Sequence, residues 1–309
     1  MSSKHYTQIV LNERPITDIT PTTFRIEKVP FGLKPSAGEV LVQVNWLSLD
    51  PAMRGWLRDA RSYVPPVQIG EVMRAAGLAT VVEVGEGSKL QPGDVVQCMP
   101  GGLTAYFGLV DVAKIKAGET LVVSGAAGAV GSVACQIGKI HGAKVIGIAG
   151  SDDKCRWLTE ELKIDAALNY KSPTFQDEFK NAVGYLDVFF DNVGGEILDF
   201  ALTRLNKGAR IALCGAISQY NASKPKGISA YLNLISQRAK IEGFLVFDYA
   251  DRYPEALTNL SKWISEDRII RKFHIVEGLE KAPESLPLLF SGGNTGKLVV
   301  RVSGSDAKL

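Results

Sequence analysis

The alternation of hydrophobic and polar residues changes character near residue 98. Before that point, runs such as 39–45 and 77–84 alternate with period two, and turns rich in glycine and proline separate them. Period-two alternation places successive side chains on opposite faces of a strand. The first part of the chain is therefore predicted to form a small β-rich barrel or sandwich.

From about residue 109 onward, short apolar runs alternate with stretches whose apolar residues recur at helical spacing. The six predicted strands lie at 120–123, 144–149, 166–169, 186–191, 209–214 and 241–247. The helices are expected at 130–140, after Ser151 as N-cap, around Phe175 and Phe179, at 196–205 and at 254–267. This order predicts the α/β fold class, with a Rossmann-type doubly wound parallel sheet that binds its ligand outside the carboxyl ends of the strands.

Two more strands, at 273–276 and 296–302, follow the last predicted helix. We expect them to return to the β-rich domain, because that arrangement needs no third core. The β-rich substrate domain is thus predicted to be discontinuous, formed by residues 1–108 and 268–309. Residues 109–267 are predicted to form the nucleotide-binding domain.

Residues 124–131, Ser-Gly-Ala-Ala-Gly-Ala-Val-Gly, join the first strand of the sheet to its helix. Glycines here let the backbone approach a pyrophosphate, and the helix N-terminus offers free N–H groups to an anion. The residues predicted to bind the cofactor are Ala126, Gly128, Ala129, Val130 and Gly131. Ala126 replaces the first glycine of the usual fingerprint, and a tight turn that binds nothing is the alternative interpretation.

The end of the second strand indicates which dinucleotide is bound. NAD-specific folds carry a carboxylate there, whereas this chain has Gly150 and Ser151, with Lys154 one turn into the helix. A missing acid and a nearby amine favour the 2′-phosphate of NADP. The next residues, Asp152 and Asp153, are explained as partners of the helix dipole. Two alternatives stay open: Lys154 as a solvated helix residue, and Tyr170 as a side chain that caps the core instead of flanking the phosphate.

Composition excludes several other classes. The net charge is +2, without a basic run that would bind nucleic acid, and no apolar window approaches the length of a membrane span. Four isolated cysteines and three scattered histidines predict no structural zinc. The N-terminus lacks a secretion signal, so we expect a cytoplasmic protein. The end, Ala307-Lys308-Leu309, differs in one residue from the peroxisomal address Ser-Lys-Leu, which leaves import into peroxisomes or a disordered tail as alternatives.

Several motifs together resemble one family. They are residues 49–55, the glycine stretch 124–131, 150–154, 169–171, 191–195, 214–221, 243–249 and 293–297. Over nearly the whole chain they look like the zinc-independent medium-chain dehydrogenase/reductases, in the group of prostaglandin reductases, leukotriene B4 12-hydroxydehydrogenases and plant alkenal double-bond reductases. The resemblance implies a GroES-like barrel domain, a Rossmann domain, NADPH as cofactor, a homodimer, and reduction of the C=C bond of α,β-unsaturated ketones or aldehydes.

The resemblance also assigns site residues. Ser151, Lys154 and Tyr170 would hold the 2′-phosphate, and Tyr249 would stand over the nicotinamide beside the substrate carbonyl. Further cofactor contacts are implied for Asn192, Cys214, Ser218, Tyr220, Phe247 and Asn294. Met53 and Arg54, in the first motif, would face the substrate.

Two departures from the family pattern concern the substrate cleft. The family commonly has a tyrosine where this chain has Ala52, which suggests a roomier pocket. Between Cys98 and Gly102 only Met99, Pro100 and Gly101 intervene, where the family has a substantial segment. An internal deletion there would remove part of one wall of the cleft.

The chemistry asks little of the protein, because a bound nicotinamide supplies the hydride. Negative charge grows on the carbonyl oxygen of the enone, so a hydrogen-bond donor is needed, and Tyr249 is the candidate. Rim or core filling is the alternative role of this tyrosine. Two other functions stay open: an NADPH quinone oxidoreductase, and an NADPH-binding protein without turnover.

Overall fold

The structure, a computed structural model, describes residues 5–98 and 103–302. It divides into two compact units, Met1–Pro100 with Phe273–Leu309, and Gly101–Lys272. The boundaries expected at 108 and 268 differ from these by a few residues. At the first boundary the reason is that helix α2 (Leu103–Phe107) packs on α3 (Ala129–Ile140) and so belongs to the second unit.

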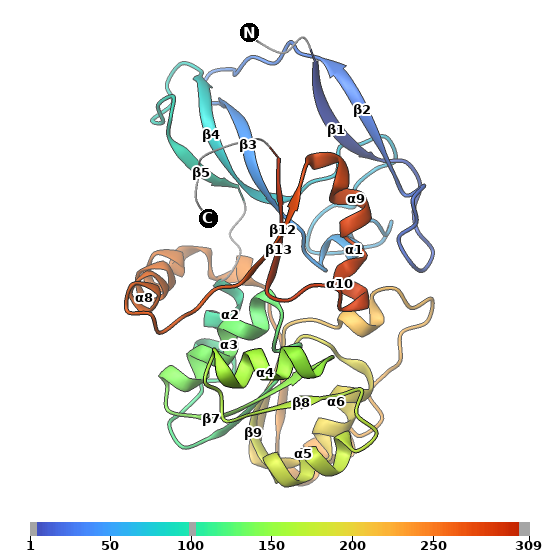
Figure 1. Ribbon diagram of the computed structural model, residues 1–309, viewed down its shortest axis with the longest axis vertical. Coiled ribbons are helices and arrows are strands. Elements are labelled where there is room, and N and C mark those ends of the chain that lie inside the picture. Colours follow the sequence, from blue (N-terminus) through green and yellow to red (C-terminus); the bar gives the residue numbers. More distant parts are fainter. Residues whose placement is uncertain (1–4, 99–102, 303–309) are drawn as a thin grey trace. The chain divides into compact units, whose positions relative to one another are not determined.

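A six-stranded parallel sheet forms the centre of the second unit (Figure 1). Its strands are β6 (Thr120–Ser124), β7 (Lys144–Ala149), β8 (Ala166–Asn169), β9 (Leu186–Asp191), β10 (Leu205–Leu213) and β11 (Lys240–Gly243). Their order is β11-β10-β9-β6-β7-β8, so the chain runs outward from β6 in one direction and from β9 in the other. The predicted doubly wound sheet is confirmed, and its switch point lies between β6 and β9.

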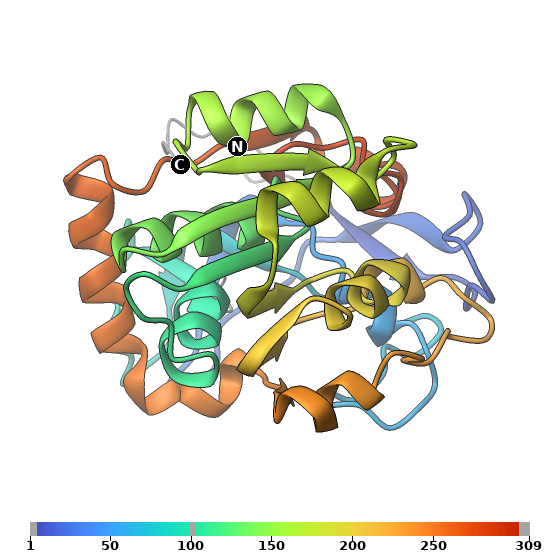
Figure 2. The ribbon, with the colours of Figure 1, turned by 90° about the horizontal axis from the view of Figure 1, so that it is seen from below.

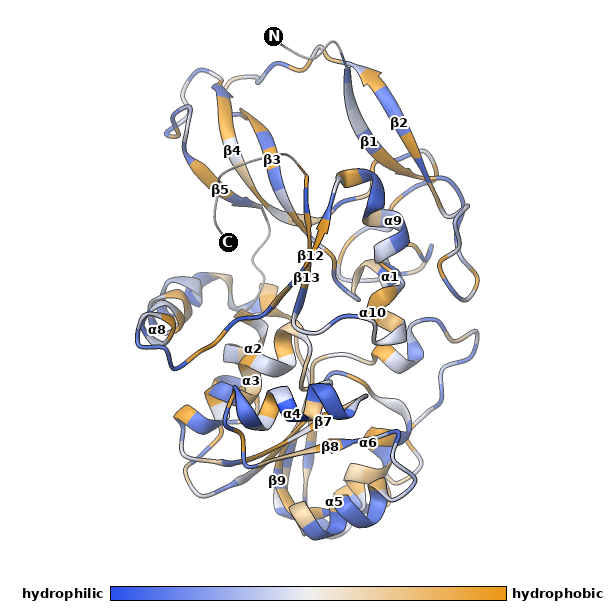
Figure 3. Cartoon of the chain, viewed as in Figure 1, coloured by the Kyte–Doolittle hydropathy of each residue, from blue (hydrophilic) through white to orange (hydrophobic). Residues whose placement is uncertain are grey.

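Both faces of this sheet are covered by helices (Figure 2), which explains why its strands are apolar at successive positions. Leu121 and Val123 reach one core, and Val122 between them reaches the other. The first core is completed by α2, α3, α4 (Asp152–Glu160) and α8 (Tyr253–Ser265). The second is completed by α5 (Phe175–Val183), α6 (Gly195–Leu202) and α7 (Leu232–Gln237). Figure 3 shows hydrophilic and hydrophobic residues mixed along α5 and α8, as expected of helices with one buried face.

Two predicted boundaries in this unit are wrong. Helix α6 ends at Leu202, and Leu205, predicted as its last residue, already begins β10. The sixth strand, predicted to reach residue 247, ends at Gly243. The chain leaves the sheet there because Phe244 packs edge-on against Phe190 of β9, with ring centroids 6.3 Å apart, and a 3₁₀ segment η3 (Val246–Arg252) follows.

The first unit is β-rich (Figure 1). The strands β1 (His5–Leu11) and β2 (Phe24–Pro30) form an antiparallel pair. A five-stranded sheet has the order β12-β13-β3-β4-β5, built from β3 (Val40–Ser48), β4 (Ala76–Val84), β5 (Val95–Cys98), β12 (Phe273–Glu277) and β13 (Lys297–Arg301). Because β13 pairs antiparallel with β3, two distant stretches of the chain make this sheet.

Short helical segments complete the two units. The first unit contains α1 (Met53–Trp56), η4 (Leu279–Lys281), α9 (Ala282–Ser285) and α10 (Leu288–Ser291). The second contains a π-helical turn η1 (Gly108–Val112), which continues α2, and a 3₁₀ turn η2 (Ile217–Gln219). None of the helices among the described residues is long and apolar enough to cross a membrane.

Candidate functional site

The turn between β6 and α3 brings two stretches of backbone unusually close. Gly125 has φ +58°, a left-handed conformation that favours glycine, and its carbonyl accepts a hydrogen bond from the Gly128 amide at 2.9 Å. A Cβ on Gly131 would lie 2.3 Å from the same carbonyl oxygen, so only glycine fits there. The first amides of α3 have no acceptor within their own helix and can bind an anion. The turn therefore fits a pyrophosphate group.

Buried Asp191, at the end of β9, ties the two central strands together at the switch point. Its carboxylate accepts hydrogen bonds from the Ser124 hydroxyl at 2.6 Å and from the amides of Val193 and Gly194. Burial raises the pKa of Asp191, and these donors oppose that rise. The Asn192 side chain donates to the Ser124 carbonyl at 2.7 Å. Asn192, predicted to contact the cofactor, thus also fixes the strand ends.

The loop after β10 contains three more predicted cofactor residues. The Ser218 hydroxyl donates to the Val193 carbonyl at 2.7 Å, and the Tyr220 hydroxyl accepts from the Ala216 amide at 3.2 Å. Burial, with the charge of Asp191, raises the pKa of the Cys214 thiol to about 12, so the thiol stays protonated at neutral pH. These side chains shape the loop that flanks the ends of β9 and β10.

Lys154 and Lys171 lie beyond the ends of β7 and β8, and their charges act on each other. Ser151 is the N-cap of α4, as predicted, and accepts a hydrogen bond from the Lys154 amide at 3.3 Å. Burial lowers the pKa of the half-buried Lys154 ammonium, and the charge of Lys171 lowers it further. The Lys171 Nζ lies 5.8 Å from the centroid of the Tyr170 ring. The Lys171 ammonium beside the exposed Tyr170 ring and the Lys154 ammonium, whose pKa Lys171 lowers, are groups suited to bind a phosphate.

Two nearby carboxylates and Gly150 are also compatible with a bound phosphate. Asp152 accepts a hydrogen bond from Asn169 Nδ2 at 2.8 Å, and Asp153 forms an ion pair with Arg156. A Cβ on Gly150 would meet the Tyr170 ring at 3.0 Å, so the glycine makes room for that ring. The position that holds an acid in NAD-binding folds is therefore occupied by an aromatic ring, and the residues present fit the 2′-phosphate of NADP.

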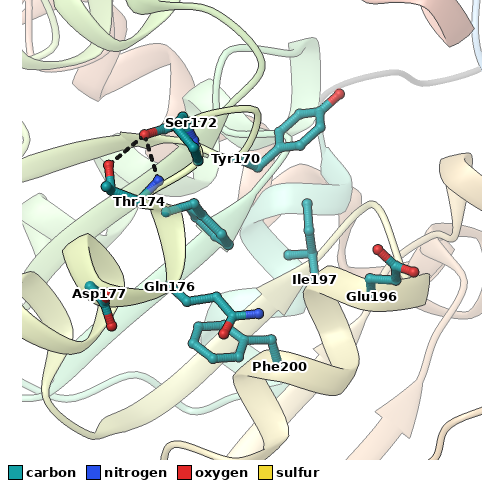
Figure 4. Close-up of a pocket in the computed structure, with 10 residues that line it drawn as sticks. Tyr170, Ser172, Thr174, Gln176, Asp177, Glu196, Ile197 and Phe200 are labelled. Atoms are coloured by element: carbon teal, nitrogen blue, oxygen red, sulfur yellow. Dashed lines mark hydrogen bonds between the residues drawn. The ribbon is translucent and has the colours of Figure 1, made fainter.

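Two surface hollows flank the loop after β8, and both include Ser172. One has a volume of about 370 Å³ and lies between α5 and α6, with Tyr170 and Glu196 at its rim (Figure 4). The Ser172 hydroxyl accepts a hydrogen bond from the Thr174 amide there, at 3.3 Å. The other hollow, of about 500 Å³, is lined by Asp152, Cys155 and Glu178 among others. Lys154 and Lys171 line neither of these two hollows, whereas Tyr170 lines the first.

Tyr249 and Phe247 lie on η3, beyond the sheet; Phe247 was expected to end the sixth strand, and Tyr249 was expected just after it. The Tyr249 ring stacks on Phe107, with centroids 4.5 Å apart and an interplanar angle of 15°. Burial raises the pKa of the Tyr249 phenol, and the charges of Asp111, Glu242 and Asp248 add to the rise. The phenol is therefore a hydrogen-bond donor at neutral pH. Phe247 is 38% exposed.

The three site residues predicted in the first unit have structural partners within it. Arg54 is fully buried, and its guanidinium donates to the carbonyls of Pro15, Ile16 and Thr17, the last at 2.7 Å. Met53 is 2% exposed and belongs to the core. Both side chains pack the first unit, and the substrate contacts expected of Met53 and Arg54 stay predictions. Buried Asn294 donates to the Gly296 carbonyl at 3.0 Å and shapes the turn before β13.

Ser124, Asp191 and Lys171 lie in motifs that the sequence analysis used, but no role was predicted for them. An acid at the end of the apolar run Leu-Asp-Val-Phe-Phe-Asp was the available signal for Asp191, and the neighbour of Tyr170 was the signal for Lys171. The short link Met99-Pro100-Gly101 and the tail Ala307-Lys308-Leu309 lie outside the described residues. Within the described ranges no group of three or more His, Cys, Asp or Glu side chains is arranged to hold a metal ion.

A parallel doubly wound sheet with an anion-binding turn at its switch point, joined to a β-rich unit, defines a two-domain dinucleotide-binding protein. Family profiles agree. The profile described as "N-terminal domain of oxidoreductase" matches residues 7–122, and the one described as "Zinc-binding dehydrogenase" matches residues 129–262. The chain belongs to the medium-chain dehydrogenase/reductase family, in the group that contains the prostaglandin, 2-alkenal and curcumin reductases.

Individual relatives cover nearly the whole chain. A putative NADP-dependent oxidoreductase of Bacillus subtilis is 40% identical over 96% of this chain and 97% of its own length. The NADPH-dependent curcumin reductase of Escherichia coli is 36% identical over 96% of this chain and 97% of its own length. The crystal structure of CurA from Vibrio vulnificus in complex with NADPH superimposes with a TM-score of 0.90 at 36% identity, covering 97% of this chain and all of that one.

The alignment with the Bacillus protein spans 333 positions, although this chain has 309 residues. That relative therefore carries residues without a counterpart here. This agrees with an internal deletion, and its predicted place between Cys98 and Gly102 remains a prediction.

Proposed function

We propose that the protein is an NADPH-dependent ene reductase that acts on the C=C bond of small α,β-unsaturated ketones or aldehydes. The observation that carries the proposal is the similarity, at 36% identity over 96% of the chain, to a curcumin reductase that is NADPH-dependent. Lys154, one turn into α4, and Lys171, beside the Tyr170 ring, support the choice of NADPH over NADH. The 2-alkenal reductase of Nicotiana tabacum, 36% identical over 89% of this chain, supports the substrate class.

In this proposal three regions of the second unit bind the cofactor or the substrate. The first amides of α3 bind the pyrophosphate, and Ser151, Lys154 and Tyr170 bind the 2′-phosphate, so that the nicotinamide is oriented by groups distant from it. When bound, NADPH supplies the hydride that adds to the β-carbon of the enone. The Tyr249 hydroxyl donates a hydrogen bond to the carbonyl oxygen, where negative charge grows.

The test is NADPH consumption measured with a panel of enals, enones and quinones. NADPH deuterated at C4 should place the label on the β-carbon of the saturated product, as read by mass spectrometry. Consumption with quinones alone would replace this proposal by a quinone oxidoreductase. Quenching of protein fluorescence by NADPH without any consumption would indicate a protein that binds the cofactor and does not turn over.

The role of Tyr249 is tested by Tyr249→Phe, with Tyr185→Phe as the matched control because Tyr185 is 52% exposed on another part of the unit. We expect Tyr249→Phe to lower kcat on the order of 100-fold, since one oxyanion donor commonly contributes that much. The affinity for NADPH should stay unchanged. An unaltered kcat would remove Tyr249 from the mechanism.

We further propose a homodimer. The support is the row of exposed apolar residues on and beside α7: Tyr231, Leu232 and Ile235 are 55%, 63% and 70% exposed. Exposed apolar patches of this kind mark contact surfaces. Sedimentation equilibrium of the wild type and of Ile235→Glu tests it, and a monomeric wild type at micromolar concentration would reject it.

A further inference from the structure

Residues 266–272 form the connector that leads from α8 to β12 (Figure 1). The amides of Arg268 and Ile269 both donate to the Trp263 carbonyl of α8, at 2.8 and 3.1 Å. The Ile269 side chain is 4% exposed and belongs to the core that α3 and α8 also form. The connector is therefore attached to the second unit as far as Ile269, shortly before β12 begins at Phe273.

The next residue of the connector is bound by a side chain of α3. Gln136 Nε2 donates to the Ile270 carbonyl at 3.0 Å, and Gln136 Oε1 accepts from the Ile270 amide at 2.7 Å. Gln136 Nε2 also donates to the Ser132 carbonyl at 3.0 Å, and the Gln136 side chain is 3% exposed. A buried amide whose donors and acceptor are all used holds its partner in one position. Gln136 thus fixes Ile270 against α3, although the two residues are 134 positions apart in the chain.

A second contact joins the connector to α4. The Lys272 ammonium lies 5.0 Å from the centroid of the Trp157 ring, a distance at which a cation is attracted to the face of an indole. Trp157 is 5% exposed, and its Nε1 donates to Glu161 at 3.0 Å, so the ring itself is fixed. The first turns of α3 and α4 are predicted to bind the pyrophosphate and the 2′-phosphate. The two helices predicted to bind NADPH therefore also hold the last residues before the first unit.

We propose that Gln136 and Lys272 are positioning residues for substrate binding: they hold the connector on the two predicted cofactor-binding helices and so restrict how the chain enters β12. The proposal rests on the proposed function, in which the first unit belongs to the substrate domain. A restricted connector lowers the conformational entropy that is lost when a substrate binds. NADPH, by stabilising the first turns of α3 and α4, also steadies the connector. The other link between the two units contains residues 99–102, which lie outside the described residues.

Gln136→Leu removes the hydrogen bonds to Ile270 and leaves an apolar side chain in the core. Ile270 is 41% exposed, so its freed backbone groups can bind water and the variant should fold. We expect the KM for an enone to rise on the order of tenfold, with the Kd for NADPH, measured by calorimetry, unchanged within about twofold. Lys139→Met is the matched control on α3, because Lys139 pairs with Asp165 and not with the connector. A wild-type enone KM in Gln136→Leu, or equal losses of enone and NADPH affinity, would overturn the proposal.

Lys272→Gln tests the contact with α4 at an exposed residue, where loss of folding is not expected. We expect the enone KM to rise about two- to fivefold, since an exposed cation on an aromatic ring contributes that much. Lys272→Arg, which keeps the cation, should have the wild-type KM. Equal KM values in the two Lys272 variants reject the role of this contact. If Gln136→Leu does not fold, this pair of variants makes the comparison in its place.

Hydrogen exchange without substrate separates this proposal from the proposed function. NADPH should slow exchange of the amides of residues 268–272 at least about threefold in the wild type and not in Gln136→Leu. Slowing in both proteins, or in neither although NADPH binds, rejects the coupling of the connector to the cofactor. Failure of the wild type to reduce any enone, with the expected exchange pattern, sinks the proposed function and leaves that coupling standing. Enone reduction with a wild-type KM in Gln136→Leu sinks the positioning role and leaves the proposed function standing.

Discussion

The turn after β6 and the segment after β11 both follow strands of one parallel sheet, but different forces hold them. The turn from Gly125 to Gly131 is set by backbone contacts within seven residues, including the 2.9 Å hydrogen bond from the Gly128 amide to the Gly125 carbonyl. Tyr249 stacks on Phe107 of α2, and Arg252, three residues further on, pairs with Asp111 of η1 and Glu255 of α8. The glycine turn therefore tolerates no added carbon at Gly131, whereas the surroundings of Tyr249 depend on ring stacking and on the ion pairs of Arg252.

Among these variants, Gly131→Ala should weaken NADPH binding most. Its Cβ would meet the Gly125 carbonyl oxygen at 2.3 Å, so the backbone of the turn must move. We expect NADPH binding to weaken on the order of 100-fold or more, a loss of roughly 3 kcal/mol, as measured by calorimetry. Gly128→Ala is the matched control, because its Cβ would lie 3.2 Å from the same oxygen. Equal losses in the two variants would show that the turn is not organised by close backbone approach.

Lys154→Ala should have the second largest effect on NADPH binding. It removes a positive charge from the predicted cofactor site and leaves the backbone of the glycine turn intact. We expect affinity for NADPH to fall about 10- to 100-fold and affinity for NADH to stay unchanged, since only NADPH has the 2′-phosphate. Lys171→Ala should act in the same direction but less, because Lys171 is more exposed. Lys207→Ala, at an exposed site on β10, is the control. Equal loss of both nucleotides in Lys154→Ala would contradict the assignment.

Glu119→Gln tests a charge pair with Arg210 at the amino end of β6, the opposite end of that strand from the glycine turn. Burial raises the pKa of Glu119, but hydrogen bonds from Arg210 and the Lys116 amide outweigh it and hold the pKa below its ordinary value of 4.5. The ionised form therefore stabilises the fold above pH 4.5, and this contribution disappears as the pH falls through the lowered pKa.

We expect Glu119→Gln to lower the free energy of unfolding by about 1–2 kcal/mol at pH 7 and to match the wild type in strongly acidic buffer. Urea unfolding at several pH values measures this, with Glu160→Gln on the exposed side of α4 as control. A difference that persists in acid would mean that the ion pair is not its cause. NADPH binding should not change.

Tyr106→Phe should give the smallest effect. The Tyr106 hydroxyl donates to Glu255 at 2.9 Å and accepts from Asn259 Nδ2 at 2.9 Å. Glu255 also accepts hydrogen bonds from Arg252, so Tyr106 contacts Arg252 indirectly, through Glu255. We expect a loss of about 1 kcal/mol in the free energy of unfolding, as for one hydrogen bond, with NADPH affinity preserved. A large loss of NADPH affinity in Tyr106→Phe would contradict this view, because it would show that the surroundings of Tyr249 and the glycine turn are energetically coupled.

The sequence by itself predicted what depends on local pattern. The strands of the sheet, the glycine turn and the Ser151 N-cap follow from periodicity and from residues a few positions apart. These features are legible because parallel strands covered on both faces are apolar throughout, and because helix caps are set by the nearest side chains. Lys154 was found for the same reason: it lies within one turn of the strand end.

Only the tertiary structure decided how distant side chains are used. Arg54 lies in a motif that resembles a substrate-binding one, yet the carbonyls of residues 15–17 bury it. Tyr249 was expected at the end of a strand, but the packing of Phe244 on Phe190 ends β11 early and turns Tyr249 onto Phe107. Asp111 and Arg252 form their pair across 141 positions of chain. Such contacts depend on how the helices pack on the sheet, and no local pattern of residues encodes that.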